Sequence, residues 1–136
     1  MRFVLDASVA AAWYLPESFA QKARHWQSRL LSGEIEFVVP SLHFWELANV
    51  FRTYVRRDEL DANDAIEAYE LHCAAPLETA DPLKQSVLNV ALEYGTTSYD
   101  AVYIALAIEQ DAQLLTAENP RREWLKALKK RVISLG

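Results

Sequence analysis

The hydrophobic pattern alternates between short apolar runs and longer stretches with helical periodicity. Runs of about three apolar residues are too short for helices, and the polar or turn residues that close them are typical of strands buried on both faces of a parallel sheet. Such runs occur at Phe3–Leu5, Phe37–Val39, Leu114–Thr116 and Val132–Ile133, and Pro76–Glu78 is at best a very short edge strand. Their alternation with helices predicts the α/β class: a three-layer α/β/α domain with a short-stranded, mainly parallel central sheet and helices on both faces.

Capping and breaking residues mark the helices between these strands. Val9–Leu15 fits a short helix that ends before Pro16, and Ser18 with Gln21 matches a capping box for a helix that stops at Gly33. The further boundaries are helix starts at Ser41, Asp61, Asp81, Thr97 and Asn119 and a helix end at Gly95.

Three acidic residues lie at or just beyond the ends of these strands, and a fourth lies at the start of a later helix. Asp6 directly follows the first strand, and Glu46 lies about one turn into the helix after the second. Asp100 is in the first turn of the helix that opens at Thr97, and Glu118 lies just beyond the third run. Because open α/β folds place their ligands at the carboxyl edge of the sheet, we expect these carboxylates to converge there.

Each acid has an ordinary explanation when it is taken alone. Asp6 could cap the helix that follows it, and Glu46 could be a solvated carboxylate that the helix dipole favours. Four converging carboxylates, in contrast, would repel one another and raise one another's pKa values unless a cation compensates. Oxygen-only ligands suit Mg²⁺ or Mn²⁺ and do not suit Zn²⁺. The pattern therefore predicts a metal-dependent acidic site.

The composition is that of one globular domain, which we expect to span residues 1–136. Hydrophobic residues make up 51% and charged residues 24%, and no apolar window is long enough for a membrane span. The amino terminus has one arginine followed by a strand, which does not resemble a secretory signal. The single cysteine, Cys73, cannot form an internal disulfide. We therefore expect a cytoplasmic protein that does not enter a membrane.

The net charge of −5 weighs against broad, nonspecific nucleic-acid binding, which usually shows a basic surplus. Basic residues are nevertheless bunched, at Arg52, Arg56 and Arg57 and again between residues 121 and 131. Such clusters could contact phosphates, or they could be solvated helix faces. Charge alone leaves both interpretations open.

Four blocks of the sequence resemble the PIN domain, and in particular the VapC-type toxins of bacterial and archaeal toxin–antitoxin pairs. The blocks are FVLDASV at 3–9, VVPSLHFWELANV at 38–50, TSYDAVYIALA at 97–107 and LLTAEN at 114–119. They occur in the family's order and at about its separations, and the match covers essentially the whole chain. The resemblance implies a PIN-like fold and a metal-dependent endoribonuclease that uses Mg²⁺ or Mn²⁺.

The resemblance also implies roles for the residues at the matching positions. Asp6, Glu46 and Asp100 would be the core acids that bind the metal, and Ser8 and Thr116 would be supporting hydroxyls that orient these acids or the attacking water. The family further implies an RNA substrate, a homodimer and a small VapB-type antitoxin. That antitoxin would lay a peptide into a hydrophobic groove beside the acids.

The last block departs from the family pattern. It usually reads Thr-x-Asp, whereas this chain has Thr116, Ala117 and Glu118. The glutamate keeps the charge and reaches one methylene further, so it could bind metal directly, bind it through a water molecule, or lie outside the site. We include Glu118 as a fourth candidate catalytic and metal-binding acid.

Phosphodiester cleavage is possible with these residue types alone. A carboxylate-held metal ion activates bound water and neutralises charge on phosphate oxygens, so no histidine is needed. His43 lies near Glu46 in the sequence and could act in catalysis, or it could cap a helix or pack in the core instead. Trp13 and Trp45 also lie near acids and could stack on RNA bases or form packing contacts. Trp26 and Trp124 are expected in the core or at a partner contact.

The alternative function is a catalytically inactive PIN-like module for RNA binding or assembly. Three intact core acids argue against it, because a scaffold has little reason to concentrate repelling charge. A phosphatase of the haloacid-dehalogenase type would need Asp-x-Asp at the first strand, where this chain has Ser8 at the third position. A receiver domain would need a phospho-acceptor aspartate after a mid-chain strand and a lysine after a later one, and the sequence has neither.

Overall fold

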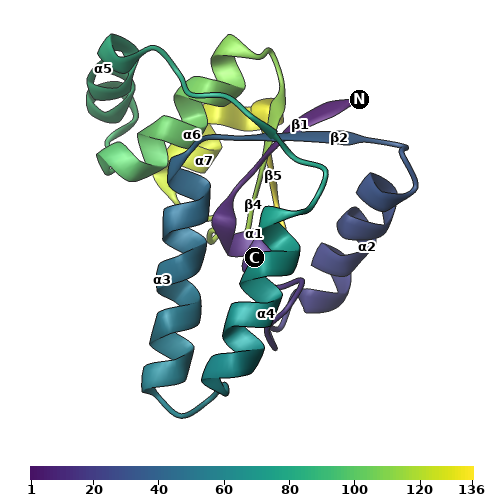
Figure 1. Cartoon of the computed structure of the whole chain (residues 1–136). Coiled ribbons are helices and arrows are strands. Elements are labelled where there is room, and N and C mark those ends of the chain that lie inside the picture. Colours follow the sequence, from purple (N-terminus) through teal and green to yellow (C-terminus); the bar gives the residue numbers. More distant parts are fainter.

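The computed structural model covers residues 1–136 and is built on a five-stranded sheet (Figure 1). All neighbouring strands are parallel, in the order β3-β2-β1-β4-β5. The prediction of a mainly parallel α/β sheet is therefore confirmed, and the weak edge strand expected near residues 76–78 corresponds to β3. The strands are β1 (Arg2–Leu5), β2 (Glu36–Val39), β3 (Glu78–Thr79), β4 (Gln113–Thr116) and β5 (Val132–Ser134).

Seven α-helices and one short 3-10 helix connect the strands and cover them. No helix has both the length and the apolar character that a membrane crossing requires. The helices are α1 (Ala7–Ala11), α2 (Ala20–Leu31), α3 (Leu42–Arg56), α4 (Ala62–Cys73), α5 (Lys84–Tyr94), α6 (Ser98–Glu109) and α7 (Glu123–Leu128), with the 3-10 helix at Lys129–Arg131.

Alternate residues of the inner strands β1, β2 and β4 face two different helical layers. Val4, Val38 and Leu114 pack into one core cluster with residues of α5, α6 and α7. Their strand neighbours, among them Leu5 and Phe37, pack into a second cluster with residues of α1 and α2. This period-two alternation produces the predicted three-layer arrangement, with helices on both faces of the sheet.

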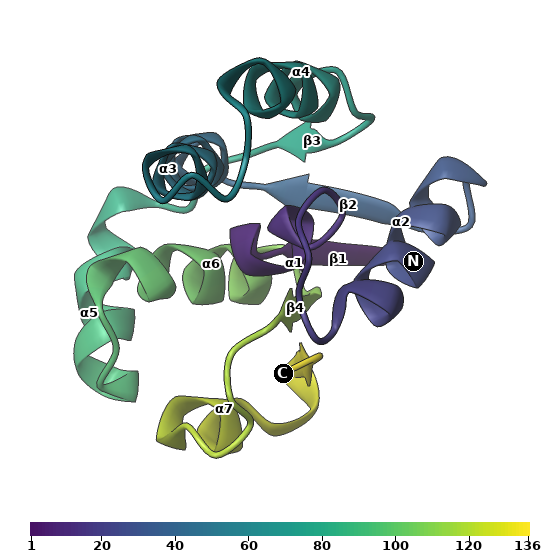
Figure 2. The same ribbon diagram turned by 90° about the horizontal axis from the view of Figure 1, so that it is seen from below.

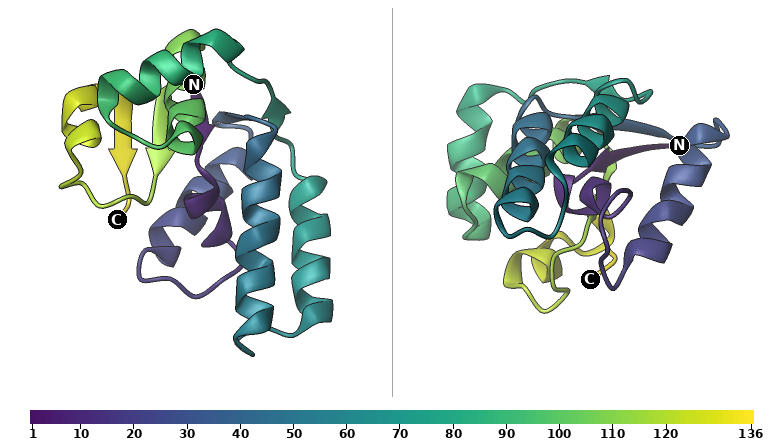
Figure 3. Two further views of the ribbon diagram at one scale, coloured as in Figure 1. Left: turned by 90° about the vertical axis from the view of Figure 1, so that its left-hand side faces the viewer. Right: turned by 60° about the horizontal axis from the view of Figure 1, so that its bottom comes forward.

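The helices α3 and α4 form an antiparallel hairpin that extends beyond the carboxyl edge of the sheet (Figure 3). A third core cluster, which includes Leu15, Leu47 and Phe51, joins this hairpin to the segment after α1. Tyr69 of α4 donates its hydroxyl to the carbonyl oxygen of Phe44 in α3, at 2.9 Å. These contacts fix α3 against α4 and the segment after α1.

Several predicted helix boundaries are confirmed by their capping geometry. Asp61 accepts from the backbone N–H of Asn63 at 3.1 Å where α4 begins. Thr97 accepts from the backbone N–H of Asp100 at 3.1 Å where α6 begins. Gly95 ends α5 with a φ of +66°, in the left-handed conformation that glycine adopts without strain.

The first two helices differ from the prediction. α1 starts directly after Asp6, earlier than the predicted Val9, because the Asp6 carboxylate caps it by accepting from the backbone N–H of Ser8 at 3.4 Å. It also ends well before Leu15, whose side chain is buried in the core. α2 has no side-chain cap, so the predicted capping box that begins at Ser18 is wrong.

Two later predicted helix starts, at Asp81 and Asn119, are also wrong, because each side chain bonds to a group other than the start of its helix. The Asp81 carboxylate accepts from the backbone N–H of Ser41 at 2.7 Å and from the Ser41 hydroxyl at 2.8 Å. α5 therefore begins later, at Lys84, and Ser41 precedes α3 without capping it through its side chain. α7 begins at Glu123, because the Asn119 side chain closes a local turn instead of starting the helix.

Candidate active site

The order of the strands in the sheet changes direction between β1 and β4, although all strands run parallel. Connections lead from β1 toward β2 and β3 on one side and from β4 to β5 on the other. In open parallel sheets such a switch point leaves a crevice at the carboxyl ends of the strands. Asp6 follows β1 and Thr116 ends β4, so both residues lie at this crevice. Figure 2 shows α1 and α6 beside the ends of these strands.

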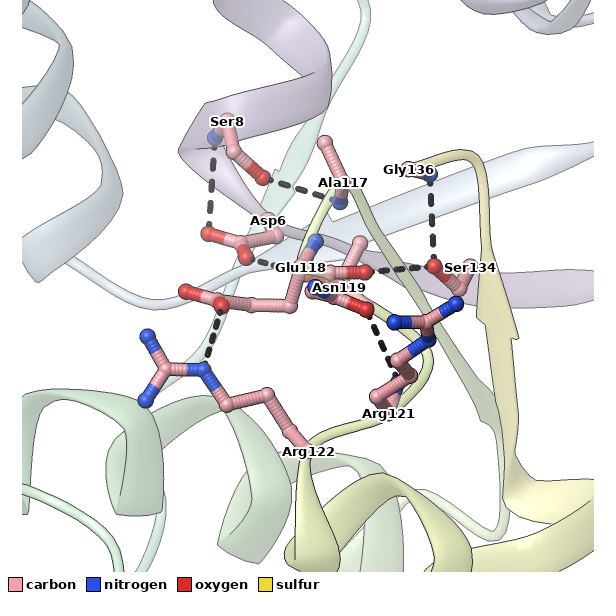
Figure 4. A network of polar contacts seen from close by, with 10 residues as sticks. Asp6, Ser8, Ala117, Glu118, Asn119, Arg121, Arg122, Ser134 and Gly136 are labelled. Carbon is pink, nitrogen blue, oxygen red and sulfur yellow. Dashed lines mark hydrogen bonds and ion pairs between the residues drawn. The ribbon is translucent and has the colours of Figure 1, made fainter.

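Hydroxyl groups tie together the acid block, which here means Asp6, Glu118 and the backbone next to them (Figure 4). The Thr116 hydroxyl donates to Asp6 Oδ2 at 2.7 Å, and its oxygen accepts from the backbone N–H of Glu118 at 3.2 Å. The Ser8 hydroxyl oxygen accepts from the backbone N–H of Ala117 at 3.1 Å, which ties the start of α1 to the end of β4. Both predicted supporting residues therefore contact this block, and Thr116 orients Asp6 directly.

Tyr103 fixes the carboxylate of Glu46. Its hydroxyl donates to Glu46 Oε1 at 2.6 Å, and the tyrosine is only 3% exposed. The contact joins α6 to α3 across the site. No sequence motif assigns Tyr103 to the site. The available signal is its spacing, three residues after Asp100, which places both residues on one face of α6.

Three of the acids have raised pKa values. Burial is the largest cause for Asp6, Glu46 and Asp100, and the pKa of Glu46 rises to about 7. Negative neighbours add to the shift, because Asp6 and Asp100 raise the pKa of Glu46, and Asp6 and Glu118 raise the pKa of Asp100. Hydrogen bonds such as that from Thr116 to Asp6 oppose the rise without cancelling it. The four predicted acids therefore lie close enough to repel one another.

Glu118 is paired with a basic residue. Arg122 Nε lies 3.5 Å from Glu118 Oε2, and the Arg122 charge also acts to lower the pKa of Asp100. The Arg122 side chain is 64% exposed, so water screens the pair and it contributes little stability. In Figure 4, Arg122 reaches toward Glu118 while Arg121 points away from it. The sequence placed Arg122 only in a basic cluster, and no helical spacing indicated this pair, because α7 begins after both residues, at Glu123.

A family model for the PIN domain matches residues 3–124. The chain belongs to the PIN-domain family. Ribonuclease VapC3 of Pyrobaculum aerophilum is 32% identical to it over 132 residues, which are 94% of this chain and 98% of that relative. The resemblance to VapC-type PIN domains that the sequence indicated is thus confirmed.

Solved structures share this PIN fold. A crystal structure of a protein from Pyrobaculum aerophilum has a TM-score of 0.76 at 25% identity, covering 99% of this chain and 84% of that chain. The crystal structure of VapBC2 from Rickettsia felis, bound to a DNA fragment from their promoter, has a TM-score of 0.63 at 14% identity. That match covers 98% of this chain and 97% of the other, and at this identity it shows the fold alone.

The chemistry of the acids in this PIN domain fits a hard divalent cation. These acids offer only oxygen donors. Burial and neighbouring negative charges raise the pKa values of Asp6, Glu46 and Asp100, and the positive charge of Arg122 opposes this rise only at Asp100. No three His, Cys, Asp or Glu side chains are arranged closely enough to coordinate one metal ion together. The crevice therefore holds neighbouring acids rather than a preassembled cage.

The buried histidines of the PIN domain lie outside the acid block. His43 and His72 are fully buried, with their Nε2 atoms 2.8 Å apart. His43 Nδ1 lies 3.1 Å from the carbonyl oxygen of Leu5, and the Tyr14 hydroxyl lies 2.9 Å from His72 Nδ1. Of the roles that the sequence left open for His43, the structure supports packing.

The four tryptophans separate into core and surface residues. Trp13 and Trp124 are buried, and Trp13 donates its indole N–H to the carbonyl oxygen of Ala23 at 2.9 Å. Trp26 is partly buried against the second core cluster. Trp45 is 67% exposed, so of the two tryptophans near acids only this one can reach a ligand.

Proposed function

We propose that this protein is a metal-dependent endoribonuclease of the VapC type, which hydrolyses RNA phosphodiester bonds with Mg²⁺ or Mn²⁺. The proposal treats residues 1–136 as one PIN-like domain that acts in the cytoplasm. The observation that carries it is the group of mutually repelling acids at the β1–β4 switch point, with Asp6 oriented by the Thr116 hydroxyl. A scaffold gains nothing from such concentrated charge, whereas a cation-dependent site requires it. The 32% identity to Ribonuclease VapC3 supports the same activity.

Four acids are assigned to the cation: Asp6, Glu46, Asp100 and Glu118. A divalent cation bound among them would lower the pKa of a water molecule and neutralise charge that develops on phosphate oxygens. Partial burial of these side chains strengthens their electrostatic interactions, because the surrounding protein screens charge less than water does. The same acids therefore serve both cation binding and catalysis in this proposal.

The protein's own hydroxyl groups restrict how the acids move. Thr116 donates to one oxygen of Asp6 and Tyr103 donates to one oxygen of Glu46, so each carboxylate is held in one orientation. Ser8 holds the end of β4 against the start of α1 through its contact with the backbone. We assign supporting roles to Ser8 and Thr116 and a positioning role to Tyr103.

A VapB-type antitoxin and a second copy of this chain are the proposed protein partners. The VapBC2 structure of Rickettsia felis, which shares the fold, supports the choice of antitoxin. An apolar groove of about 340 Å³ lies between α3 and α4 and could receive an antitoxin peptide. Its lining is Ala48, Phe51, Arg52, Val55, Ala62, Ala65, Ile66, Tyr69 and Glu70.

The test of the activity is incubation of the purified protein with a mixed RNA pool in Mg²⁺, in Mn²⁺ and in EDTA. We expect discrete fragments with either cation and intact RNA in EDTA. Asp6→Asn and Asp100→Asn should remove most of the cleavage while circular dichroism shows an unchanged fold. Intact RNA under every condition would overturn the proposal and favour an inactive module for RNA binding or assembly.

A further inference from the structure

A small pocket lies beside the acids and shares Glu46 with them. Leu42, Trp45, Glu46 and Asn49 line it from α3 at i, i+3, i+4 and i+7 spacing, and Tyr99 from α6 completes it. Its volume is about 220 Å³, which is below the roughly 300–1,000 Å³ of sites for drug-sized molecules. The pocket therefore suits one flat ring system rather than a larger ligand.

The two aromatic side chains of this pocket are exposed to solvent. Trp45 is 67% exposed and Tyr99 is 65% exposed, and neither belongs to a core cluster. Trp45 directly precedes Glu46 and Tyr99 directly precedes Asp100, so each aromatic ring is carried by the same helical turn as a site acid. Packing does not explain their positions, whereas a ligand at the rim of the acid crevice would.

We propose that this pocket binds an unpaired nucleobase of the RNA, next to the phosphate on which the acids act. The inference rests on the function proposed above. Exposed aromatic faces stack on any base, and such stacking is a main source of affinity for single strands. Asn49 adds an amide donor and a carbonyl acceptor for the base edge. Glu46 joins the pocket to the acid crevice, so a base held here belongs to a nucleotide at the reacting phosphate.

A protein partner is the competing occupant, because exposed aromatic residues are also enriched at protein interfaces. The pocket is small and includes a carboxylate of the site, and burial of a carboxylate under an apolar partner is costly. The separate groove between α3 and α4 is larger and mostly apolar, so it is the better site for a peptide. The chemistry of the small pocket favours a base.

The first test is steady-state cleavage of single-stranded RNA at saturating Mg²⁺. Trp45→Ala and Tyr99→Ala should each raise KM about 5- to 150-fold, with a smaller change in kcat. Trp45→Phe and Tyr99→Phe keep an aromatic face and should restore most of the affinity. Asn49→Ala should change which positions of the RNA are cut. Leu92→Ala removes a side chain that is 75% exposed on α5, and this control should match wild type.

Binding without cleavage supplies a second measurement. Trp45 is the exposed tryptophan, so single-stranded RNA added to the Asp6→Asn protein in Mg²⁺ should quench its fluorescence. The quenching should disappear in Asp6→Asn/Trp45→Ala and weaken in Asp6→Asn/Tyr99→Ala.

The outcomes separate this proposal from the proposed function. If RNA quenches Trp45 but the wild-type protein never cleaves, the nuclease assignment fails and the base pocket stands. If wild type cleaves and the alanine variants keep its KM and its cut positions, the base pocket is wrong. If sedimentation shows that the alanine variants bind RNA poorly only because a dimer has separated, the surface is a protein interface and the proposal is equally overturned.

Discussion

At the scale of single residues, neutral donors rather than counter-ions hold the central acids in place. Thr116 donates to Asp6 at 2.7 Å and Tyr103 donates to Glu46 at 2.6 Å. These hydrogen bonds stabilise the ionised carboxylates, but burial and repulsion outweigh them, because the pKa values of both acids still lie above their usual range. The cation-free site is therefore electrostatically strained.

Glu46→Gln should relieve part of this strain. The pKa of Glu46 rises from 4.5 to about 7 on folding. Protonation of Glu46 therefore stabilises the folded state in full below pH 4.5, and this stabilisation is lost as the pH rises through 7. In EDTA at pH 8 the variant should be more stable than wild type by about 1–2 kcal/mol, since solvent screening reduces the full shift. The difference should vanish near pH 4.

Urea unfolding at both pH values measures this effect. Glu93→Gln removes an exposed carboxylate on α5 and should change stability little at either pH. A Glu46→Gln protein that is less stable than wild type at pH 8 would contradict the crowding of the acids.

Glu118→Gln tests the position at which this chain leaves the family pattern. If Glu118 holds a second, weaker cation position, the variant should raise the Mg²⁺ concentration for half-maximal cleavage far more than it lowers the maximal rate. Glu118→Asp should fall between the two proteins. Glu123→Gln, on the exposed start of α7, is the matched control. Overlapping metal titrations for all four proteins would remove Glu118 from the site.

At the scale of elements, buried polar contacts tie the helices to the strand that carries Asp6. The carbonyl oxygen of Leu5 only accepts, so His43 Nδ1 carries a proton, and His72 Nε2 then donates to His43 Nε2 while Tyr14 donates to His72 Nδ1. Both histidines are neutral in this arrangement, which agrees with burial lowering the pKa of His43 to about 3 and the pKa of His72 to about 4. One chain of hydrogen bonds thus links β1, α3, α4 and the segment after α1.

His72→Phe should break this chain and alter the acid sensitivity of the fold. The variant leaves His43 Nε2 and the Tyr14 hydroxyl without partners, which should cost about 2–4 kcal/mol at pH 7.5. Because the histidine pKa values are lowered on folding, their contribution is complete above pH 6.5 and is lost as the pH falls toward about 4. Lowering the pH from 7 to 5 should therefore reduce the free energy of unfolding of wild type by about 2 kcal/mol for each buried histidine.

Urea unfolding at pH 7 and pH 5 isolates the share of His72. The acids titrate in both proteins, so the difference between the two pH dependences reports the lost histidine, and the variant should be the less sensitive protein. His25→Phe changes an exposed histidine outside this hydrogen-bond chain and is the matched control. Equal sensitivity of the wild-type and His72→Phe proteins would show that His72 titrates normally in the fold.

A second tether between distant segments joins Asp81 to the start of α3. Asp81→Ala removes two hydrogen bonds to Ser41, at 2.7 and 2.8 Å, and should lower the free energy of unfolding by about 1–2 kcal/mol. Because Glu46 lies in the first turns of α3, the cleavage rate should fall as well. Asp64→Ala removes an exposed carboxylate from α4 and serves as the control. Unchanged stability and rate in Asp81→Ala would mean that the contact does not anchor α3.

At the scale of the whole molecule, three surfaces share one helix. α3 supplies Glu46 to the acid crevice, Trp45 and Asn49 to the small pocket, and Phe51 and Val55 to the apolar groove. The helix extends from the carboxyl edge of the sheet beside α4 (Figures 1 and 3). A partner bound in the groove would therefore contact the helix that positions Glu46, one of the proposed catalytic acids.

Expression of this chain without an antitoxin should arrest bacterial growth. Uncontrolled RNA cleavage at the acid site is the expected cause, so Asp6→Asn, expressed to the same level by immunoblot, should be harmless. The measurement is culture density after induction, together with the integrity of extracted RNA. If wild type and Asp6→Asn were equally harmless at equal levels, the toxin assignment would be wrong although the fold would stand.

Local sequence alone determined the α/β class, the order of strands and helices, and the acids that meet at the sheet edge. Apolar triplets such as Phe3–Leu5 have few structural alternatives, and parallel strands bring their carboxyl ends to one edge whatever the details of packing. The positions of Asp6 and Asp100 were therefore predictable, because they follow from where a strand ends and a helix begins, whereas Thr116 was expected only from the resemblance to the PIN domain. The catalytic roles of these residues stay predictions.

Tertiary structure alone decided the partners of side chains that pair with residues distant in the sequence. Asp81 looked like a helix cap, but Ser41, distant in sequence, provides two donors that its own helix start does not. Trp13 and Trp45 both lie near acids in the sequence, yet Trp13 is buried beneath α2 and Trp45 faces solvent. Local propensity differs by about 1 kcal/mol or less between such alternatives, and one long-range hydrogen bond or buried ring is worth as much or more.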